Sequence, residues 1–263
     1  MKKVVLITGA SQGIGLATAN FLIDKGLIVY GLSRRAPKTP QKYNFIEGDV
    51  TDEASIKHAL EEINKKEGRL DIVINNAGMG ISGASEYTTK EEIEKIFSVN
   101  VFGVFTVCNL AIPYLRKSKG QIINIGSVAG ELYIPFQSYY SATKASIESY
   151  SIALRGELKP FGIRVSVVLP GDTKTNFTFN REKSEILRDE IYGDRISHSL
   201  EVMEHDEQNG MPATSVSKVI YKLTKSKNPS IVKTVGFKYK LFIFLKRIVP
   251  AKFLNYIIYK IYG

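Results

Sequence analysis

Residues 4–15 read VVLITGASQGIG, an apolar run followed at once by three closely spaced glycines. The β-branched run Val4–Ile7 is typical of a buried strand. Gly9, Gly13 and Gly15 then permit a tight turn and let the backbone approach a ligand closely, and the helix that follows offers unpaired N–H groups to a phosphate. The alternative is a glycine-rich turn that binds nothing. The strand–turn–helix context favours a phosphate-binding turn.

The first two hundred residues alternate apolar runs with helical patterns, which indicates βαβ units and a parallel sheet covered on both faces. We expect one α/β domain over residues 1–235, a doubly wound sheet in three layers, with the polar segment 174–213 as an irregular, flexible insertion over the substrate. The predicted strands are Val4–Ile7, Ile28–Leu32, Asn44–Glu47, Ile72–Asn75, Gln121–Ile125, Arg164–Leu169 and Ser230–Val235. The predicted helices are Gly13–Lys25, Asp52–Lys66, Lys90–Lys117, Tyr139–Lys159 and Ser215–Lys225.

The composition is that of an ordinary soluble protein, with 44% hydrophobic and 24% charged residues. A single cysteine, Cys108, excludes internal disulfides and fits a reducing compartment, so a cytoplasmic location is expected. The apolar run after Met1 is too short for a signal peptide, and no stretch approaches the roughly 20 apolar residues that span a bilayer.

The end of the second predicted strand indicates which nicotinamide cofactor the sheet would bind. In NAD-binding sheets this strand ends in an acid that binds the ribose hydroxyls. Here Ser33 is followed by Arg34 and Arg35. An acid would repel a 2′-phosphate, whereas an arginine offers a planar fork that matches phosphate oxygens. The sequence therefore favours NADP(H), although a solvated basic loop would look the same.

Tyr140 and Lys144 lie four residues apart in a predicted helix and so share one face. A free phenol, with a pKa of about 10, is a poor proton donor or acceptor at neutral pH. A nearby ammonium would lower that pKa and make the tyrosine a usable general acid or base. Alone, the pair also fits a half-buried tyrosine beside a solvated lysine. The neighbouring Tyr139 is not four residues from Lys144, so the spacing selects Tyr140.

Small and polar residues follow several other predicted strands, where doubly wound sheets bind their ligands. They are Asp49 and Val50, Asn76 to Gly78, Ser127, and Pro170 to Thr175. The hydroxyl of Ser127 could polarise a carbonyl near Tyr140. Asn100 interrupts a long helical pattern, either as an ordinary irregularity or as a polar group aimed into the site. Each residue alone is also explained by capping of backbone groups.

Taken together and in this order, these motifs resemble the short-chain dehydrogenase/reductase family over residues 1–235. The residues that carry the resemblance are Thr8-Gly9-x-x-x-Gly13-Ile14-Gly15, Asn75-Asn76-Ala77-Gly78, Asn100, Ser127, Tyr140-x-x-x-Lys144 and Pro170-Gly171. The resemblance implies a Rossmann-type fold and hydride transfer between NADP(H) and a carbonyl or secondary alcohol. It also implies a homo-oligomer, a dimer or tetramer, built through the helices that carry Asn100 and Tyr140.

The resemblance further implies a role for each matching residue. Tyr140 would protonate the carbonyl oxygen, Ser127 would hold that oxygen, and Lys144 would bind the nicotinamide ribose and lower the tyrosine pKa. Asn100 would carry a water in the proton relay. The implied cofactor-binding residues are Gly9, Ser11, Gly13, Ile14, Gly15, Ser33, Arg34, Asp49, Val50, Asn76, Ala77, Gly78, Tyr140, Lys144, Pro170, Gly171, Thr173 and Thr175. Asp172 departs from the proline or small residue of the family, which puts the details of that turn in doubt.

The charge of the chain is concentrated in its last part. From Gln208 onward there are eleven Lys or Arg and no Asp or Glu, so the rest carries 36 − 11 = 25 basic against 26 acidic residues. Residues 236–263 contain two helical stripes, and such basic amphipathic helices are typical of membrane surfaces. The stripes are Leu241, Phe244, Leu245, Ile248 and Val249, then, after Pro250, Phe253, Leu254, Ile257, Ile258 and Ile261. Docking on the protein's own core or on another subunit is equally expected, whereas a nucleic-acid partner is disfavoured.

The sequence thus predicts an NADP(H)-dependent oxidoreductase that acts on an apolar or lipid-like substrate. Tyr133, Ile134, Pro135 and Phe136 favour such a substrate, although these residues could equally pack against the following helix. The alternatives are an NADP-binding regulator without turnover and a membrane-tethered scaffold.

Overall fold

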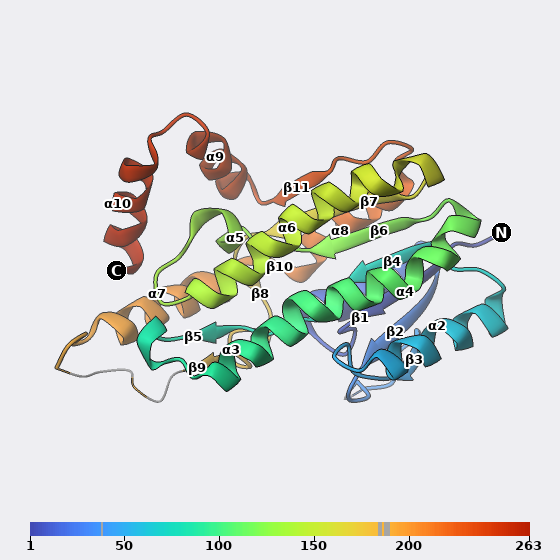
Figure 1. The fold of residues 1–263 in the computed structure, drawn as a ribbon, viewed down its shortest axis with the longest axis horizontal. Coiled ribbons are helices and arrows are strands. Elements are labelled where there is room, and N and C mark those ends of the chain that lie inside the picture. The colour runs from blue at the N-terminus through green and yellow to red at the C-terminus, as the bar shows by residue number, and fades with distance from the viewer. Residues whose placement is uncertain (38, 184–185, 187–189) are drawn as a thin grey trace.

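The computed structural model describes residues 1–37, 39–183, 186 and 190–263, which form a seven-stranded sheet between two layers of helices (Figure 1). The strand order is β11-β7-β6-β4-β1-β2-β3, and all neighbours are parallel. The strands are β1 (Val4–Thr8), β2 (Ile28–Ser33), β3 (Asn44–Glu47), β4 (Ile72–Asn75), β6 (Gln121–Ile125), β7 (Arg164–Pro170) and β11 (Val232–Val235). The doubly wound sheet and its seven predicted strands are confirmed, with ends that differ by at most two residues.

Side-chain alternation along β1 builds a core on each face of the sheet. Val4 and Leu6 pack into the cluster under helices α2 (Glu53–Glu67), α4 (Gly103–Ser118) and α6 (Ser138–Leu158). Val5 and Ile7 pack into the opposite cluster, under α1 (Gly13–Asp24) and α8 (Ala213–Lys225). Successive strand residues point to opposite faces, so a strand covered on both sides reads as a continuous apolar run.

A continuous helix carries Asn100 across the sheet. It comprises α3 (Lys90–Phe97), a π-helical turn at Ser98–Phe102 and α4, 29 residues in all. By length and composition this helix could cross a membrane, so the expectation that no stretch approaches a membrane span was wrong. It lies along the sheet with Cys108 and Leu115 fully buried, and the core helix of a globular domain passes the same test.

Residues 174–213 are more regular than the sequence predicted, because Arg195–Gln208 form helix α7. Its buried Ile196, Leu200 and Met203 recur at helical spacing, but mostly polar residues fill the positions between them, so the helical pattern is short and weak in the sequence. Two small parallel pairs tie the segment to the domain. They join β8 (Thr173–Lys174) to β10 (Met211–Pro212) and β5 (Ile81–Ser82) to β9 (Glu182–Lys183).

The short helix α5 (Ala129–Leu132) and two 3-10 turns complete the domain. The turns are at Ser85–Tyr87 and Lys159–Phe161.

The C-terminal extension forms two helices separated at Pro250, as its two stripes predicted. They are α9 (Phe237–Lys246) and α10 (Ala251–Tyr262). α9 packs on the domain through Tyr239 and Ile243, whereas Leu241 and Phe244 of the predicted stripe remain exposed.

α10 divides its stripe between two environments. Ile258 is buried, and the Tyr262 hydroxyl donates to Asp206 Oδ2 on α7 at 3.3 Å, while Phe253 and Ile257 are exposed. Figure 1 shows the C-terminal end of α10 approaching α7. Docking on the protein's own core is therefore confirmed for one face of the extension, and a second apolar face stays open.

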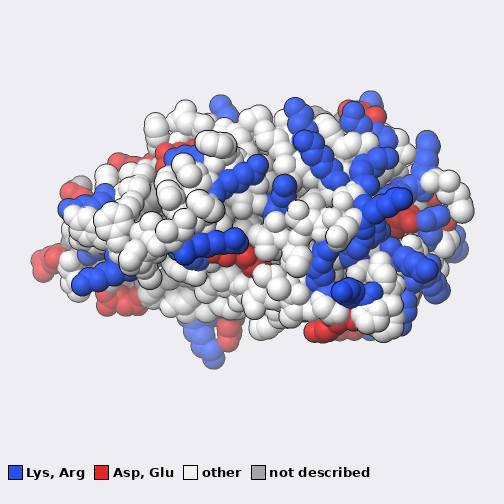
Figure 2. Space-filling model, turned by 90° about the horizontal axis from the view of Figure 1, so that it is seen from above, with Lys and Arg blue, Asp and Glu red and all other residues white. Residues whose placement is uncertain are grey.

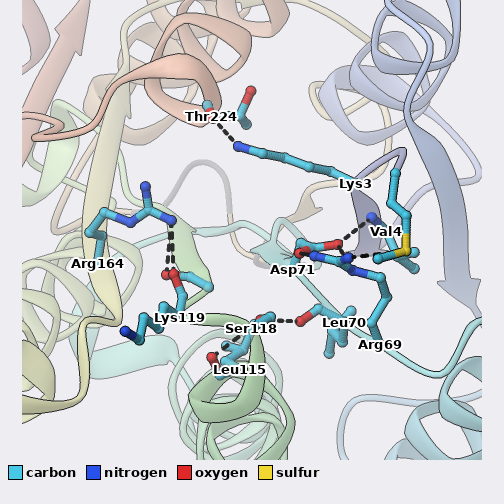
Figure 3. Close-up of polar contacts among 12 residues, drawn as sticks. Lys3, Val4, Arg69, Leu70, Asp71, Leu115, Ser118, Lys119, Arg164 and Thr224 are labelled. Atoms are coloured by element: carbon cyan, nitrogen blue, oxygen red, sulfur yellow. Dashed lines mark hydrogen bonds and ion pairs between the residues drawn. The ribbon is translucent and has the colours of Figure 1, made fainter.

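The opposite edge of the sheet, where the strands begin, is held by polar side chains (Figure 3). Buried Asp71 accepts from the Val4 amide at 2.9 Å and from Arg69 Nε at 2.9 Å. Arg164 Nη2 donates to the Lys119 carbonyl at 3.0 Å. These contacts fix the amino ends of β1, β4 and β7, so that the carboxyl ends are free to carry a site.

Candidate functional site

The carboxyl ends of β1, β4, β6 and β7 meet at one edge of the sheet, because these strands are parallel neighbours. Gly9 follows β1, Asn76 follows β4, Ser127 follows β6, and Pro170 ends β7. The topology therefore brings most of the predicted site residues to the same edge.

The glycine turn after β1 is packed so closely against neighbouring backbone that Gly9 and Gly15 have no room for a Cβ. Gly9 and Gly13 have φ of +67° and +57°, and a Cβ on Gly15 would stand 2.2 Å from the Gly9 carbonyl oxygen. Asn76 Nδ2 donates to the Thr8 and Gly9 carbonyls at 3.0 Å each and so ties the turn to β4. Among the described residues, Gln12 gives α1 no side-chain cap, which leaves first-turn N–H groups for an anion.

Thr175, in the segment that follows β7, contacts the same turn. A Cβ on Gly13 would stand 3.5 Å from Thr175 Cβ, which places the turn after β7 against the turn after β1. Ser11 and Ile14 lie in or beside the glycine turn, and Ile14 packs against the core on that face. A dinucleotide that binds along this edge would run between the two turns.

Arg34 lies at the far end of this edge, after β2. Its side chain is 73% exposed, with Nε 4.0 Å from Asp49 Oδ2, so most of the guanidinium fork is open. Ser33 is buried and donates to the Arg35 carbonyl at 3.0 Å. Val50 packs against Gly103, whose added Cβ would meet Val50 Cγ2 at 3.0 Å. Arg34 and Asp49 thus form an exposed pair, while Val50 belongs largely to the core.

Tyr140, Ser127 and Lys144 converge beside the end of β6. The Tyr140 hydroxyl is hydrogen-bonded to Ser127, whose Oγ also accepts from the Ala129 amide at 3.1 Å. Lys144 is 6% exposed, and its Nζ donates to the Ile125 carbonyl at 3.1 Å and lies 5.7 Å from the centre of the Tyr140 ring. One turn of α6 therefore carries a phenol and an ammonium to one small volume, as the spacing predicted.

Asn100 is the polar group of the π-helical turn, and its amide is aimed at the same volume. Its Oδ1 accepts from the Met79 amide at 2.8 Å, and its Nδ2 donates to the Met79 carbonyl at 2.9 Å and to Thr143 Oγ1 at 3.1 Å. A Cβ on Gly78 would stand 3.3 Å from Asn100 Oδ1 and 3.6 Å from Lys144 Nζ. Asn100 is therefore more than an irregularity of the helix.

The pKa shifts of the pair differ from the sequence expectation. Burial lowers the pKa of Lys144 to about 8. Burial also raises the pKa of Tyr140 to about 12, although the hydrogen bond with Ser127 opposes this rise. The expected lowering of the tyrosine pKa by Lys144 is not seen, because desolvation disfavours the phenolate and the ammonium alike. At neutral pH Tyr140 is a protonated phenol, which suits proton donation to a carbonyl oxygen.

Comparison with known proteins decides the family. The family model described as short chain dehydrogenase matches residues 3–186. The chain belongs to the short-chain dehydrogenase family. A 3-ketodihydrosphingosine reductase of Bacteroides thetaiotaomicron is 44% identical over 236 residues, 89% of this chain and 88% of the relative.

Two further relatives extend this picture. The NADPH-dependent 1-acyldihydroxyacetone phosphate reductase of Saccharomyces cerevisiae is 33% identical over 235 residues, 84% of this chain and 78% of the relative. The crystal structure of a short-chain dehydrogenase from Streptomyces avermitilis superposes with a TM-score of 0.82 at 30% identity, covering 94% and 93% of the two chains. This short-chain dehydrogenase is thus an NADP(H)-dependent oxidoreductase of carbonyl and alcohol groups, with a Rossmann-type fold. The alternative of a regulator without enzymatic activity is set aside.

The structure adds residues to the site of this short-chain dehydrogenase that the sequence analysis missed. The ring of Phe177 covers Tyr140, with ring centroids 5.8 Å apart, and the guanidinium of Arg181 lies 5.8 Å from the Phe177 centroid. Buried Arg181 forms an ion pair with Glu207 of α7, whose other oxygen accepts from Thr178 Oγ1 at 2.6 Å. The only sequence signal was the position of these residues in the segment expected to cover the substrate.

The apolar residues before Tyr140 contact a helix that the sequence analysis did not predict. Ile134 and Phe136 pack with Leu200 and Met203 of α7, and Tyr133 is exposed. The alternative named the following helix, α6, whereas Ile134 and Phe136 pack on α7, which comes later in the chain.

Proposed function

We propose that this enzyme reduces the keto group of a long-chain, amphiphilic lipid precursor, with NADPH as the reductant. The observation that carries the proposal is the convergence of the Tyr140 phenol, the Ser127 hydroxyl and the buried Lys144 at the end of β6. The lipid character of the substrate is supported by two relatives, named as reductases of 3-ketodihydrosphingosine and of 1-acyldihydroxyacetone phosphate.

The residues of the edge fit NADP(H), which supplies the hydride for the carbonyl carbon when it is bound. The glycine turn would hold the pyrophosphate through Gly9, Gly13, Ile14 and Gly15. The remaining contacts would be Ser11, Ser33 and Arg34 at the 2′-phosphate, Asp49 and Val50 at the adenine, Asn76, Ala77 and Gly78 at the adenosine ribose, and Lys144, Pro170, Gly171, Thr173 and Thr175 at the nicotinamide half.

Tyr140 would give its proton to the carbonyl oxygen as the alcohol forms. Ser127 would donate a hydrogen bond to the same oxygen, so that the developing charge is stabilised before the proton arrives. The ammonium of Lys144 would stabilise the phenolate that remains. Because Gly78 has no Cβ, space remains close to both Asn100 Oδ1 and Lys144 Nζ, which would suit a water that returns the proton.

The lowered pKa of Lys144 predicts how this reaction depends on pH. The rate of reduction is expected to be level below about pH 8 and to fall as pH rises through that value, because Lys144 loses the charge that stabilises the phenolate. Tyr140 stays protonated over this range, since its pKa is about 12. The check is the pH profile of kcat for NADPH oxidation. A level profile well above pH 8 would contradict the assignment, and Lys144→Arg, which keeps its charge, should remove the fall.

A substrate panel tests the proposed function. NADPH consumption would be measured with short ketones, ketosteroids, 3-ketodihydrosphingosine and 1-acyldihydroxyacetone phosphate, and repeated with NADH. We expect the highest kcat/KM for a long-chain substrate with NADPH. Equal rates with short ketones would exclude lipid specificity, and a preference for NADH would contradict the role given to Arg34.

We also propose that the open face of the C-terminal extension binds an anionic membrane surface, on the cytoplasmic side. Phe237, Phe244 and Ile248 are 85%, 57% and 66% exposed, and the segment from residue 208 onward carries eleven basic residues and no acid. Figure 2, which views the side of α9 and α10, shows a broad uncharged area crossed by Lys and Arg. Such a surface favours insertion of apolar groups between anionic headgroups.

Substitution of the open face separates membrane binding from docking. Phe237→Ser with Leu241→Ser and Phe244→Ser leaves the docked Tyr239 and Ile243 in place. We expect at least about 100-fold weaker binding to vesicles of equal parts phosphatidylcholine and phosphatidylglycerol, because three large apolar side chains no longer enter the lipid. Co-sedimentation measures the affinity. Phe161→Ser, at an exposed site away from the extension, is the control; unchanged binding of the triple variant would rule out this surface.

A homo-oligomer is proposed through the helices that carry Asn100 and Tyr140. Phe102 on the π-helical turn and Ile152 on α6 are 58% and 45% exposed. Exposed apolar side chains on these two helices would suit a subunit interface. The molar mass from light scattering tests this proposal, and a monomer at micromolar concentration would contradict it.

A further inference from the structure

The C-terminal extension packs directly on the turn that follows β7. The Tyr239 ring lies over Gly171, where an added Cβ would stand 2.1 Å from Tyr239 Cδ2 and Cε2. A Cβ on Gly236, which has φ of +94°, would stand 2.8 Å from Tyr239 Cδ2. Two glycines far apart in the sequence thus make room for one aromatic ring.

The hydroxyl of the same tyrosine holds the residue that departs from the family pattern. Tyr239 donates a hydrogen bond to Asp172 Oδ2. Burial raises the pKa of Tyr239 well above that of a free phenol, so the hydroxyl stays protonated as the donor. Burial also raises the pKa of the Asp172 carboxyl, and the hydrogen bond from Tyr239 opposes this rise. Burial disfavours the charge of the Asp172 carboxylate in this turn, and the hydrogen bond from Tyr239 of α9 stabilises that charge.

The other side of the turn is fixed by hydrogen bonds to its carbonyl groups. The Met211 amide donates to the Asp172 carbonyl at 2.9 Å, and Thr173 Oγ1 donates to the Gly171 carbonyl at 2.7 Å. A Cβ on Gly210 would stand 2.4 Å from the Asp172 carbonyl. The turn is therefore held between β10 and Tyr239, and from it the chain runs to Thr175 beside the glycine turn.

We propose that Tyr239 is a positioning residue for the reaction, which fixes Asp172 and with it the turn that presents Gly171, Thr173 and Thr175 to the nicotinamide half of NADP(H). The C-terminal extension is then part of the catalytic apparatus as well as a surface element. This inference rests on the proposed placement of the cofactor.

Binding measurements test the inference without any substrate. Tyr239→Phe keeps the ring on Gly171 and removes only the hydroxyl. We expect NADPH to bind about tenfold more weakly by calorimetry, because the loss of a hydrogen bond to a charged group loosens the turn. The fragment 2′,5′-ADP, which lacks the nicotinamide half, should bind as to the wild type. Asp172→Ala, which removes the acceptor of the Tyr239 hydroxyl, should behave like Tyr239→Phe, and the double variant should lose no more than either alone.

Two controls separate positioning from general damage. Tyr256→Phe on α10 removes a hydroxyl from a residue that is 57% exposed and should leave NADPH binding unchanged. Hydrogen exchange of the peptide over residues 170–176, measured without cofactor, should rise in Tyr239→Phe and not in Tyr256→Phe. Wild-type NADPH affinity in Tyr239→Phe would overturn the inference, as would equal weakening of NADPH and 2′,5′-ADP. Absence of turnover with every ketone, together with selective weakening of NADPH, would contradict the proposed substrate and leave this inference supported.

Discussion

Tyr140→Phe is expected to lower kcat for carbonyl reduction by about 10³-fold and to leave the Kd of NADPH nearly unchanged. A general acid contributes about 10²- to 10⁴-fold to a rate, and the phenol is the protonated group that Ser127 orients. The ring itself stays against Phe177, so the walls of the site are preserved. Single-turnover oxidation of NADPH with a saturating ketone measures the chemical step directly.

The adjacent tyrosine provides the matched control. Tyr139 lies beside Tyr140 on α6, but its hydroxyl donates to the Ser85 carbonyl at 3.4 Å. Tyr139→Phe should therefore keep kcat close to that of the wild type. If Tyr140→Phe retained a rate near that of the wild type, the proton would have another source, and the role given to Tyr140 would be wrong.

Glu207→Gln is expected to have the largest effect on stability, lowering the free energy of unfolding by about 3 kcal/mol or more. Glu207 is the ion-pair partner of Arg181, whose side chain is 2% exposed. Among the described residues, Arg181 Nη1 has no hydrogen-bond partner, so this charge depends heavily on Glu207. Removing one partner of a buried pair leaves an uncompensated charge, which costs far more than the loss of a surface pair.

Chemical denaturation measures this difference against a surface pair of the same kind. Lys57 and Glu53 are 2.6 Å apart on α2 and more than half exposed, so Glu53→Gln should leave the free energy of unfolding nearly unchanged. The apolar double variant Arg181→Met with Glu207→Leu should recover part of the loss. If Glu207→Gln lost no more stability than Glu53→Gln, the Arg181–Glu207 pair would be exposed to water. The buried position given to Arg181 beside Phe177 would then be wrong.

The sequence was sufficient for the sheet because both faces of every central strand are covered. Such strands are continuous β-branched runs, as in Ile72–Asn75, and leave little ambiguity. Their ends were less certain, because pairing with a neighbour extends β1 to Thr8 and β7 to Pro170, beyond the apolar run. Helix α7 was missed because only one residue in three or four is buried.

The catalytic set was visible from local spacing, whereas its surroundings were not. Four residues on a helix place Tyr140 and Lys144 on one face in any fold. The contacts of Tyr239 with Asp172 and of Arg181 with Glu207 join segments that meet only after folding. The direction of the Tyr140 pKa shift was also beyond the sequence, because it depends on how deeply both groups are buried.

Transfer of a labelled hydride tests the central claim most directly. The enzyme would be given NADPH deuterated at the transferring position and a long-chain 3-keto amphiphile, and the product would be analysed by mass spectrometry. We predict one deuterium on the carbinol carbon for each NADPH oxidised, with labelled alcohol formed about 10³-fold more slowly by Tyr140→Phe. NADPH oxidation without a labelled alcohol, or formation of labelled alcohol by Tyr140→Phe at the wild-type rate, would contradict the account.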